Sequence, residues 1–334
     1  MALYKNSLLV FLAFASIYII WGSTFLAIFY GLQGFPPFIL SGFRFLIAGL
    51  ILFAWRYAKG EKVLSLPNWK KNAITGSLIL AGGTGLVAWG EQYVTSTEAA
   101  IAIATGPFWF IAIDKKNWNY YFSNKYIVLG LAIGFSGLLL FLKGSVSSVS
   151  VKADSSTRII AFVVLALSSV SWVLGALYSK NNPAGHSTFM NIAQQLIVAG
   201  TVSFSIALIR GEWSSIHFAE VPIKAWAGLG FLIVFGSIIA YLSFIWLLSI
   251  KDTVTVSTHT YINPIVAVLL GWIIAGESIT STQFIGLGII LAGVLFTNIS
   301  KYKIKLDKRT KVKLRRINRF LTKISRPYKH ITTS

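Results

Sequence analysis

Residues 7–30 read SLLVFLAFASIYIIWGSTFLAIFY, an uncharged stretch that is long enough to cross a lipid bilayer as one helix. Further stretches of the same character lie at residues 37–57, 71–92, 96–113, 125–142, 159–179, 187–209, 224–248, 254–275 and 281–299. A transmembrane β-barrel would instead show alternating segments of about 10 residues. The sequence therefore predicts an all-α integral membrane protein with ten transmembrane helices.

The composition of the whole chain agrees with this prediction. Of its 334 residues, 55% are hydrophobic and only 12% are charged, whereas a soluble domain carries about 25% charged residues. The chain contains no Cys, which excludes disulfides and zinc–thiolate sites. Its sequence also lacks a G-x-x-x-x-G-K-[ST] phosphate loop and an H-E-x-x-H zinc motif. We therefore expect a protein that is not an enzyme and that holds no cofactor and no metal.

Lys and Arg indicate which side of the membrane each loop faces, because they concentrate on the cytoplasmic side. They are frequent at residues 56–71 and 115–125, and most of all in the tail at residues 301–334. All three segments share one side if the N-terminus is cytoplasmic, so we expect both termini in the cytoplasm. We expect the basic tail to bind anionic lipid headgroups rather than nucleic acid.

The two halves of the chain match each other at a nearly constant spacing. Only 11 residues are Trp, yet Trp21 aligns with Trp172 at an offset of 151 residues, and Trp89 aligns with Trp246 at 157 residues. Similar offsets pair Ala48 with Ala199, Gly49 with Gly200, Phe53 with Phe204, Pro107 with Pro264, Gly130 with Gly286 and Gly137 with Gly293. These matches predict an internal repeat. We expect Gly82, Gly83, Gly85, Gly90, Gly130 and Gly134 to be close-packing contacts between helices rather than parts of a binding loop.

Each repeat would hold five spans, at residues 1–148 and 149–300, with the tail at residues 301–334 outside both. Because five is odd, the second repeat would enter the membrane inverted. Inverted repeats are a recurring architecture of secondary transporters, with the substrate site near the bilayer midplane. We expect a central cavity lined by the first, second, third, sixth, seventh, eighth and ninth spans. The fifth and tenth spans would lie outside it, where they could form a homodimer face.

Several short motifs carry a resemblance to a known family: residues 20–25 (IWGSTF), residues 43–49 (FRFLIAG), Pro107, Asn263-Pro264 and Gly276-Glu277. In this order and spacing they resemble the EamA-type permeases of the drug/metabolite transporter superfamily, over about residues 7–299. The resemblance implies a secondary carrier in the inner (plasma) membrane, and members export amino acids, related metabolites or drugs. The fourth span departs from the pattern, because it ends in Asp114-Lys115-Lys116 where the family often has Gly-Glu.

Arg44 is the one basic residue well inside a predicted span, where a charge costs about 2.5–3.5 kcal/mol. It could be the counter-ion of a substrate carboxylate, or it could snorkel to the interface or form an internal structural pair. Glu91, Glu98 and Glu277 fall near span ends, where we expect solvated caps. Glu91 is also a candidate for lining the cavity, because it lies beside Trp89 in a Gly-rich stretch.

Trp21, Trp89, Trp172 and Trp246 are candidates for the apolar wall of a substrate cavity. The alternative is ordinary helix packing or an aromatic belt at the membrane interface. Trp21 and Trp172 are the stronger candidates. The small polar residues Ser23 and Thr24 lie close to Trp21 in the sequence and are substrate-binding candidates with it.

The seventh span carries three amides within five residues, Asn191, Gln194 and Gln195. Amide groups are unfavourable toward lipid, so these side chains should face protein or water. They could hydrogen-bond a substrate, or they could join neighbouring helices. We include Gln194 and Gln195 among the substrate-binding candidates.

The ninth span holds His259, Tyr261 and Asn263 just before Pro264. Pro264 cannot donate a backbone hydrogen bond and can kink its helix, and Pro107 has a similar place in the fourth span. Kinked helices near the midplane are typical of transporter sites, so the three polar side chains are substrate-binding candidates. His259 could also titrate near neutral pH and carry a coupled proton.

The repeat and the resemblance together predict a secondary-active transporter that works by alternating access. Its expected partners are a small-molecule substrate, the lipid bilayer and protons. The alternative is a membrane channel or a scaffold-like membrane protein without alternating access. A channel should show a repeated polar or carbonyl filter, and none is visible in the sequence.

Overall fold

The computed structural model describes residues 2–61, 66–115, 118–146, 154–185, 187–251, 256, 259–276, 279–293 and 295–296. Secondary structure in these ranges is helical throughout. Helices long and apolar enough to cross a membrane lie at Leu8–Gly31, Pro37–Ala58, Leu66–Gly90, Ser96–Ile113, Ser155–Asn181, Thr188–Ile209 and Ile223–Ile250. Shorter apolar helices, Lys125–Phe141, Ile262–Ile274 and Ser281–Gly293, occupy the places expected for the fifth, ninth and tenth spans. The all-α membrane fold is confirmed, while the number of ten spans stays a prediction. The basic tail and Glu277 lie outside the described residues.

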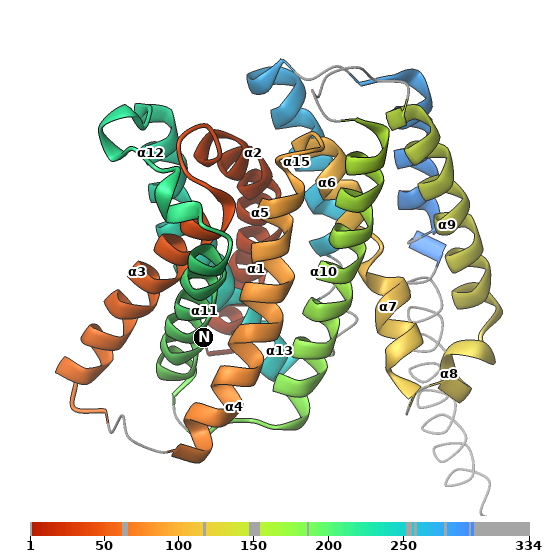
Figure 1. Cartoon of the computed structure of the whole chain (residues 1–334). Coiled ribbons are helices and arrows are strands. Elements are labelled where there is room, and N and C mark those ends of the chain that lie inside the picture. Colours follow the sequence, from red (N-terminus) through yellow and green to blue (C-terminus); the bar gives the residue numbers. More distant parts are fainter. Residues whose placement is uncertain are drawn as a thin grey trace, which may run out of the picture.

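Several spans are built from more than one helical segment (Figure 1). The first half contains α1 (Ala2–Ala15), η1 (Ser16–Ile20), α2 (Trp21–Gly31), α3 (Pro37–Ala58), α4 (Leu66–Gly76), η2 (Ser77–Gly85), α5 (Leu86–Gly90), α6 (Ser96–Ile103), α7 (Gly106–Ile113), α8 (Trp118–Phe122) and α9 (Lys125–Val146). The second half contains α10 (Ser155–Asn181), α11 (Thr188–Ile209), η4 (Glu212–Ser214), η5 (Phe218–Glu220), α12 (Ile223–Phe231), η6 (Leu232–Ala240), α13 (Tyr241–Ile250) and α15 (His259–Ala275).

Local sequence explains where several of these helices begin and end. The side chains of Thr95, Asp154 and Ser187 accept hydrogen bonds from the first free backbone N–H groups of α6, α10 and α11. Gly60 (φ +77°) and Gly211 (φ +70°) follow α3 and α11, and only glycine adopts this left-handed conformation without strain. The spans are thus bounded by residues suited to those ends.

The two glycine turns mark opposite ends of the helix bundle. The Gly60 face, at the bottom of Figure 1, holds residues 59–61 and the turn at residues 182–185. The Gly211 face, at the top of Figure 1, holds the turn at residues 32–36 and residues 210–222. Helix α3 runs from the Gly211 face to the Gly60 face, and α11 runs in the opposite direction.

Within the described residues, π-helical segments occur in three spans, as η1, η2 and η6. A π-helix bonds each carbonyl to the N–H group five residues later, which widens the turn and often marks a functional site. Segments η2 and η6 are each nine residues long and begin 155 residues apart, near the offsets that align the two halves. The third and eighth predicted spans therefore share this irregularity.

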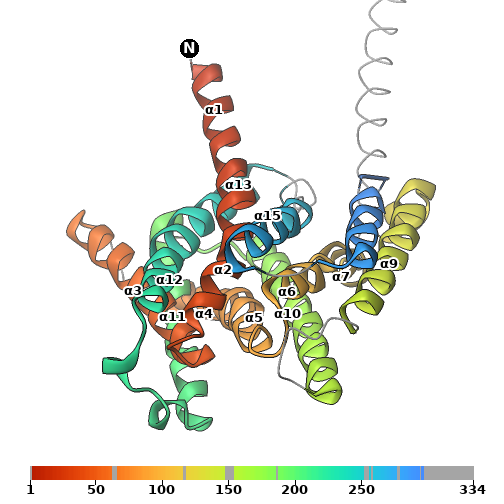
Figure 2. The same ribbon diagram turned by 90° about the horizontal axis from the view of Figure 1, so that it is seen from above.

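The outer surface of the bundle is apolar, as a lipid-facing surface should be. Large hydrophobic side chains on α11, α15 and the helix Ser281–Gly293 are exposed, among them Leu208, Ile209, Trp272 and Phe284. Figure 2 shows α1 extending away from the other helices, and Phe11 on it is 67% exposed. These surfaces need a hydrocarbon environment to be covered.

Helices α3 and α11 pack against each other through two reciprocal contacts. A Cβ atom added to Gly49 would lie 2.8 Å from the backbone nitrogen of Ile197. One added to Gly200 would lie 2.6 Å from the backbone nitrogen of Leu46. The offset of 151 residues maps Gly49 onto Gly200 and Leu46 onto Ile197, so each contact maps onto the other. This is the pattern that a two-fold axis between antiparallel helices produces.

The same reciprocity joins α9 to the helix Ser281–Gly293. A Cβ on Gly137 would lie 2.8 Å from the carbonyl oxygen of Gly286, and one on Gly293 would lie 2.6 Å from that of Gly130. The offset of 156 residues exchanges these two contacts. Of the glycines predicted to pack closely, Gly130 takes part in this contact, while Gly82, Gly83, Gly90 and Gly134 lie against side chains of other helices. A Cβ on Gly85 would have no neighbour closer than 3.8 Å.

Candidate functional site

A cavity of about 90 Å³ lies between the two halves of the chain. The first half contributes residues from α2, α3, η2, α5, α6 and α7, and the second half contributes residues from α10, η6, α13 and α15. Among the described lining residues none comes from α11, while Ile103, Gly106 and Phe110 come from the fourth span. The expectation that the seventh span lines the cavity is therefore wrong, and the fourth span takes part instead.

An aromatic cluster forms one wall of this cavity. The rings of Trp21 and Trp172 meet edge to face, with centroids 5.3 Å apart, and Phe244 lies 5.0 Å from Trp21 and 5.3 Å from Trp172. The imidazole of His259 packs 4.9 Å from Trp21. The indole nitrogen of Trp21 donates to the carbonyl oxygen of Gly236 (3.2 Å) in η6. Two Trp residues 151 positions apart in the sequence are thus brought into contact.

Arg44 lies at the cavity wall and is only 4% exposed. Its Nε donates to the hydroxyl oxygen of Ser237 (2.9 Å), and its guanidinium lies 5.1 Å from the ring centroid of Phe45. Glu91 is near enough to attract the guanidinium electrostatically. The guanidinium is therefore buried and held rather than extended to the surface. Glu91 is only 6% exposed, so the expectation of a solvated cap there is wrong, and it does not line the cavity.

Gln194 and Gln195 lie in a hydrogen-bond network behind the cavity wall. The Asn72 amide nitrogen donates to Asn191 Oδ1 (3.0 Å) and to Gln194 Oε1 (2.7 Å). Gln195 donates to Asn72 Oδ1 (2.9 Å) and accepts from the Tyr241 hydroxyl (2.6 Å). The network joins α4, α11 and α13. Only Tyr241 among these five residues also lines the cavity.

His259 and Asn263 both line the cavity from α15. His259 Nδ1 lies 2.9 Å from the carbonyl oxygen of Val256. With its amide nitrogen turned toward the neighbouring carbonyls, Asn263 lies within donor distance of the His259 (2.9 Å), Ile17 (3.1 Å) and Tyr18 (3.0 Å) oxygens. Two of these oxygens belong to η1, so Asn263 ties the ninth span to the π-helical turn of the first.

The two predicted kink prolines have different surroundings. Helix α6 ends at Ile103 and α7 begins at Gly106, so the fourth span is interrupted just before Pro107. Helix α15 runs without a break through Pro264. The side chains of Pro107 and Tyr261 lie outside the described residues.

The remaining candidates are divided between the cavity and other places. Thr24 lines the cavity, and its hydroxyl donates to the carbonyl oxygen of Trp21 (2.6 Å). The Ser23 hydroxyl donates to the carbonyl oxygen of Ile19 (2.7 Å) in η1, and Trp89 packs 5.0 Å from Tyr93. Ser23, Trp89 and Trp246 are not among the lining residues of the cavity that the structure describes. Sequence reasoning missed several polar lining residues, namely Thr84, Ser168, Ser169, Ser237, Tyr241 and Thr260. Small hydroxyls in apolar spans usually bond their own helix, so nothing in the sequence separated these from the rest.

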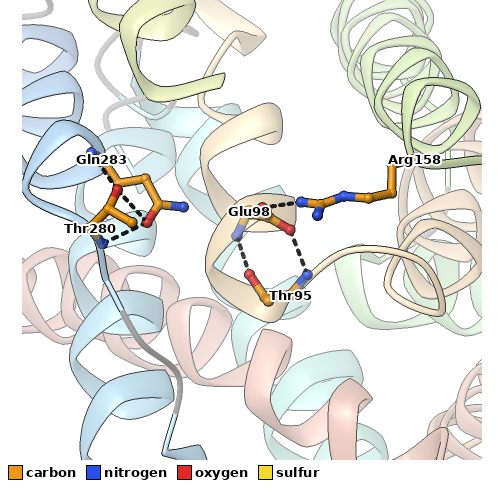
Figure 3. Close-up of polar contacts among 5 residues, drawn as sticks. All are labelled: Thr95, Glu98, Arg158, Thr280 and Gln283. Atoms are coloured by element: carbon orange, nitrogen blue, oxygen red, sulfur yellow. Dashed lines mark hydrogen bonds and ion pairs between the residues drawn. The ribbon is translucent and has the colours of Figure 1, made fainter. Parts of the chain in front are cut away.

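A second polar cluster lies at the Gly211 face, outside the cavity (Figure 3). Glu98 accepts a hydrogen bond from the backbone of Thr95 (2.9 Å), and Thr95 Oγ accepts one from the backbone of Glu98 (3.2 Å). Arg158 on α10 pairs with Glu98 Oε1 at 2.6 Å. Glu98 is a helix cap as expected, but it is fully buried rather than solvated. Thr280 and Gln283 form a similar reciprocal cap nearby.

Comparison with known proteins agrees with a transport role. The inner membrane transporter YedA of Escherichia coli (strain K12), itself uncharacterized, is 30% identical over 303 residues, which cover 90% of this chain and 94% of YedA. The S-adenosylmethionine/S-adenosylhomocysteine transporter of Chlamydia muridarum is 24% identical, covering 87% of this chain and 92% of that protein. A solved crystal structure shares the fold, with a TM-score of 0.63, 16% identity and coverage of 88% of this chain and 98% of its own.

The sequence profile of a transporter family also matches the chain twice, over residues 8–143 and 159–299. Family and relatives are membrane transporters, which implies a small-molecule substrate and gives no indication of catalysis. The apolar helices make the protein a multi-pass membrane protein. By these findings the chain belongs to the EamA-like transporter family.

Proposed function

We propose that the protein is a secondary-active transporter that exports small amphipathic molecules by alternating access. The observation that carries this proposal is the cavity between the two halves, which both halves line. Apolar side chains make up most of its lining, with a few polar groups among them, which is the usual lining of a small-molecule site. A cavity shared by two halves can open to either side when the halves move against each other.

The reciprocal helix contacts support an inverted repeat around this cavity. The α3–α11 pair and the pair of α9 with Ser281–Gly293 each place repeat-related residues in antiparallel contact. We propose ten spans in two five-span repeats, residues 1–148 and 149–300, with both termini in the cytoplasm of the inner membrane. On this topology the Gly60 face is cytoplasmic. The tail at residues 301–334 then lies on anionic lipids, and the fifth and tenth spans stay available for a homodimer.

The cavity walls suggest what the substrate should look like. Trp21 and Trp172 offer an apolar aromatic surface, and Arg44 offers a buried positive charge that can pair with an anionic group. An amino acid or related metabolite with a carboxylate and an apolar or heterocyclic part would satisfy both. The name of the Chlamydia relative adds S-adenosylmethionine and S-adenosylhomocysteine to the candidates.

Flux measurements in proteoliposomes test the proposal. A labelled panel of amino acids, metabolites and the two S-adenosyl compounds would be assayed with and without a pH gradient. We expect saturable flux that Trp21→Ala and Arg44→Ala reduce at least about tenfold. Trp272→Ala is the matched control, because Trp272 is 61% exposed on the outside of α15 and should leave flux unchanged.

Two other outcomes would favour the alternative functions. Ion conductance that does not saturate would indicate a channel, and folded protein that moves no panel member would favour a scaffold-like role. His259→Gln tests proton coupling, since His259 lines the cavity. Coupling through this residue is supported if the response to the pH gradient disappears while flux without a gradient persists.

A further inference from the structure

Glu212 at the Gly211 face crosses from the second half to hold the start of α3. Gly211 ends α11 in a left-handed conformation, and the following Glu212 side chain is buried. Its Oε2 accepts hydrogen bonds from the backbone nitrogens of Phe38 (3.0 Å) and Ile39 (3.1 Å). The first N–H groups of a helix lack acceptors within the helix, and a carboxylate there also complements the helix dipole. Glu212 therefore caps a helix of the other half.

Glu61 at the Gly60 face makes the corresponding contact from the first half of the chain to the second. Gly60 ends α3 in a left-handed conformation, and Glu61 follows it. Glu61 Oε1 accepts from the backbone nitrogen of Ser187 (2.9 Å), and Oε2 accepts from the Ser187 hydroxyl (2.8 Å). Ser187 is the residue that caps the start of α11. A glutamate of the first half thus holds the N-terminal cap of a helix in the second.

These two contacts are related by the offset that aligns the repeats. The offset of 151 residues maps Gly60 onto Gly211 and Glu61 onto Glu212. It also maps Pro36, the cap position of α3, onto Ser187. Each contact therefore joins one half to the other, one at each end of the α3–α11 pair. Between them the helices touch backbone to backbone, at the reciprocal contacts of Gly49 and Gly200.

The two carboxylates differ in how firmly they are held. Arg56 pairs with Glu61 at 2.7 Å, while Arg210 lies 3.5 Å from Glu212. Partial burial raises the pKa of Glu61, but the hydrogen bonds from Ser187 and Arg56 outweigh this effect and lower it. Burial raises the pKa of Glu212, and the bonds from α3 and the charge of Arg210 offset only part of that effect. The contact at the Gly60 face is the better stabilised of the two.

We propose that Glu61 and Glu212 are positioning residues for transport, each of which latches its own face of the bundle closed. Release of one latch lets the ends of α3 and α11 separate at that face, with the close contacts at Gly49 and Gly200 as the pivot. This inference rests on the proposed alternating access. The relative populations of the state open at the Gly60 face and the state open at the Gly211 face would then depend on two carboxylates outside the cavity, Glu61 and Glu212.

The absence of native Cys makes a direct test available. Thr84→Cys places one thiol at the cavity wall, at a partly exposed position, and a membrane-impermeant thiol reagent is applied to one side of oriented vesicles at a time. In this background Glu212→Ala should raise labelling from the Gly211 face and lower it from the Gly60 face. Glu61→Ala should do the reverse. We expect each ratio to change about fivefold, the factor that corresponds to a capping interaction of about 1 kcal/mol.

Two kinds of control separate a latch from a general loss of stability. Glu220→Ala removes an exposed glutamate at the Gly211 face and should leave both labelling rates unchanged. Glu61→Gln and Glu212→Gln keep an acceptor oxygen, so they should shift the ratio in the same direction as Ala but less. If an Ala variant fails to yield folded protein, the Gln variants carry the same comparison.

The possible results separate this inference from the function on which it rests. The proposed role of Glu61 and Glu212 would be refuted if the labelling ratio shifts in the same direction in both Ala variants, or if it shifts in neither. Labelling of Thr84→Cys from only one side in every variant would overturn alternating access itself. Opposite shifts of the labelling ratio in the two Ala variants support both the role of the two carboxylates and alternating access.

Discussion

Replacing Glu98 by Gln should destabilise the protein by about 3 kcal/mol, through the loss of one buried ion pair. Gln serves as well as Glu in a reciprocal helix cap, and the chain itself shows this at Thr280 and Gln283. The substitution therefore keeps the cap with Thr95 and removes the charge that pairs with Arg158 at 2.6 Å. It isolates the ion pair from the cap.

The size of the effect follows from the burial of the two partners. Removing one member of a buried pair costs about 3–5 kcal/mol. The Arg158 side chain is 12% exposed and can still reach water, which puts Glu98→Gln at the low end. The Glu98 side chain is 0% exposed, so Arg158→Met should cost about 5 kcal/mol. Glu98→Ala should lose a further 1 kcal/mol or so with the cap.

Equilibrium unfolding in mixed detergent micelles, followed by circular dichroism, would measure these differences. The double variant Glu98→Gln/Arg158→Met should recover most of the loss, because it leaves neither charge buried. The reasoning is refuted if the two single effects simply add in the double variant. A Glu98→Gln protein as stable as the parent would refute it as well.

Two further predictions concern packing and pH. Gly200→Ala should cost about 1–3 kcal/mol, because its Cβ would lie 2.6 Å from the backbone of Leu46, and transport should fall with it. Gly230→Ala is the control: nothing lies within 4 Å of its Cβ position, so it should be neutral or stabilising by up to about 1 kcal/mol when unfolding is measured in the same way. Burial raises the pKa of Glu212 above its usual 4.5, with Arg210 as the charged side chain that faces it. The folded protein therefore binds this proton more tightly than the unfolded chain, and the associated stability is lost as the pH rises above 4.5 through the raised pKa. Unfolding of the parent and of Glu212→Gln would be compared as the pH rises from 4.5, and only the parent should lose the stability that comes from protonated Glu212. Parallel curves of stability against pH for the two proteins would contradict a raised pKa at Glu212.

The spans could be predicted from sequence because lipid leaves the backbone few choices. A polar backbone in hydrocarbon must bond within its own helix, so long apolar stretches become helices. The predicted stretch at residues 37–57 matches Pro37–Ala58, and the stretch at residues 187–209 matches Thr188–Ile209. The π-helical segments were not predictable, because they depend on contacts with other spans rather than on local residue preference.

The site was only partly predictable for a related reason. Trp21, Thr24, Arg44, Trp172, His259 and Asn263 line the cavity, and rare residue types in apolar spans were the signal for them. Gln194 and Gln195 are polar residues of the same kind in an apolar span, but both are hydrogen-bonded to Asn72 of α4, which is far away in the sequence. Sequence periodicity does not reveal which helix faces which. The Gly-Glu pairs at residues 60 and 211 were visible at the repeat offset, yet they lie in turns, outside the spans that we compared.

The reciprocal contacts of α3 with α11 also bear on how the polypeptide could be divided. Each half carries one copy of the same antiparallel contact surface, so the close packing of these two helices, rather than the connecting peptide, specifies how the halves meet. We expect residues 1–148 and 149–334, made as separate polypeptides in one cell, to assemble without a covalent link. A five-span half alone would present this surface to a second copy of itself inserted the other way up.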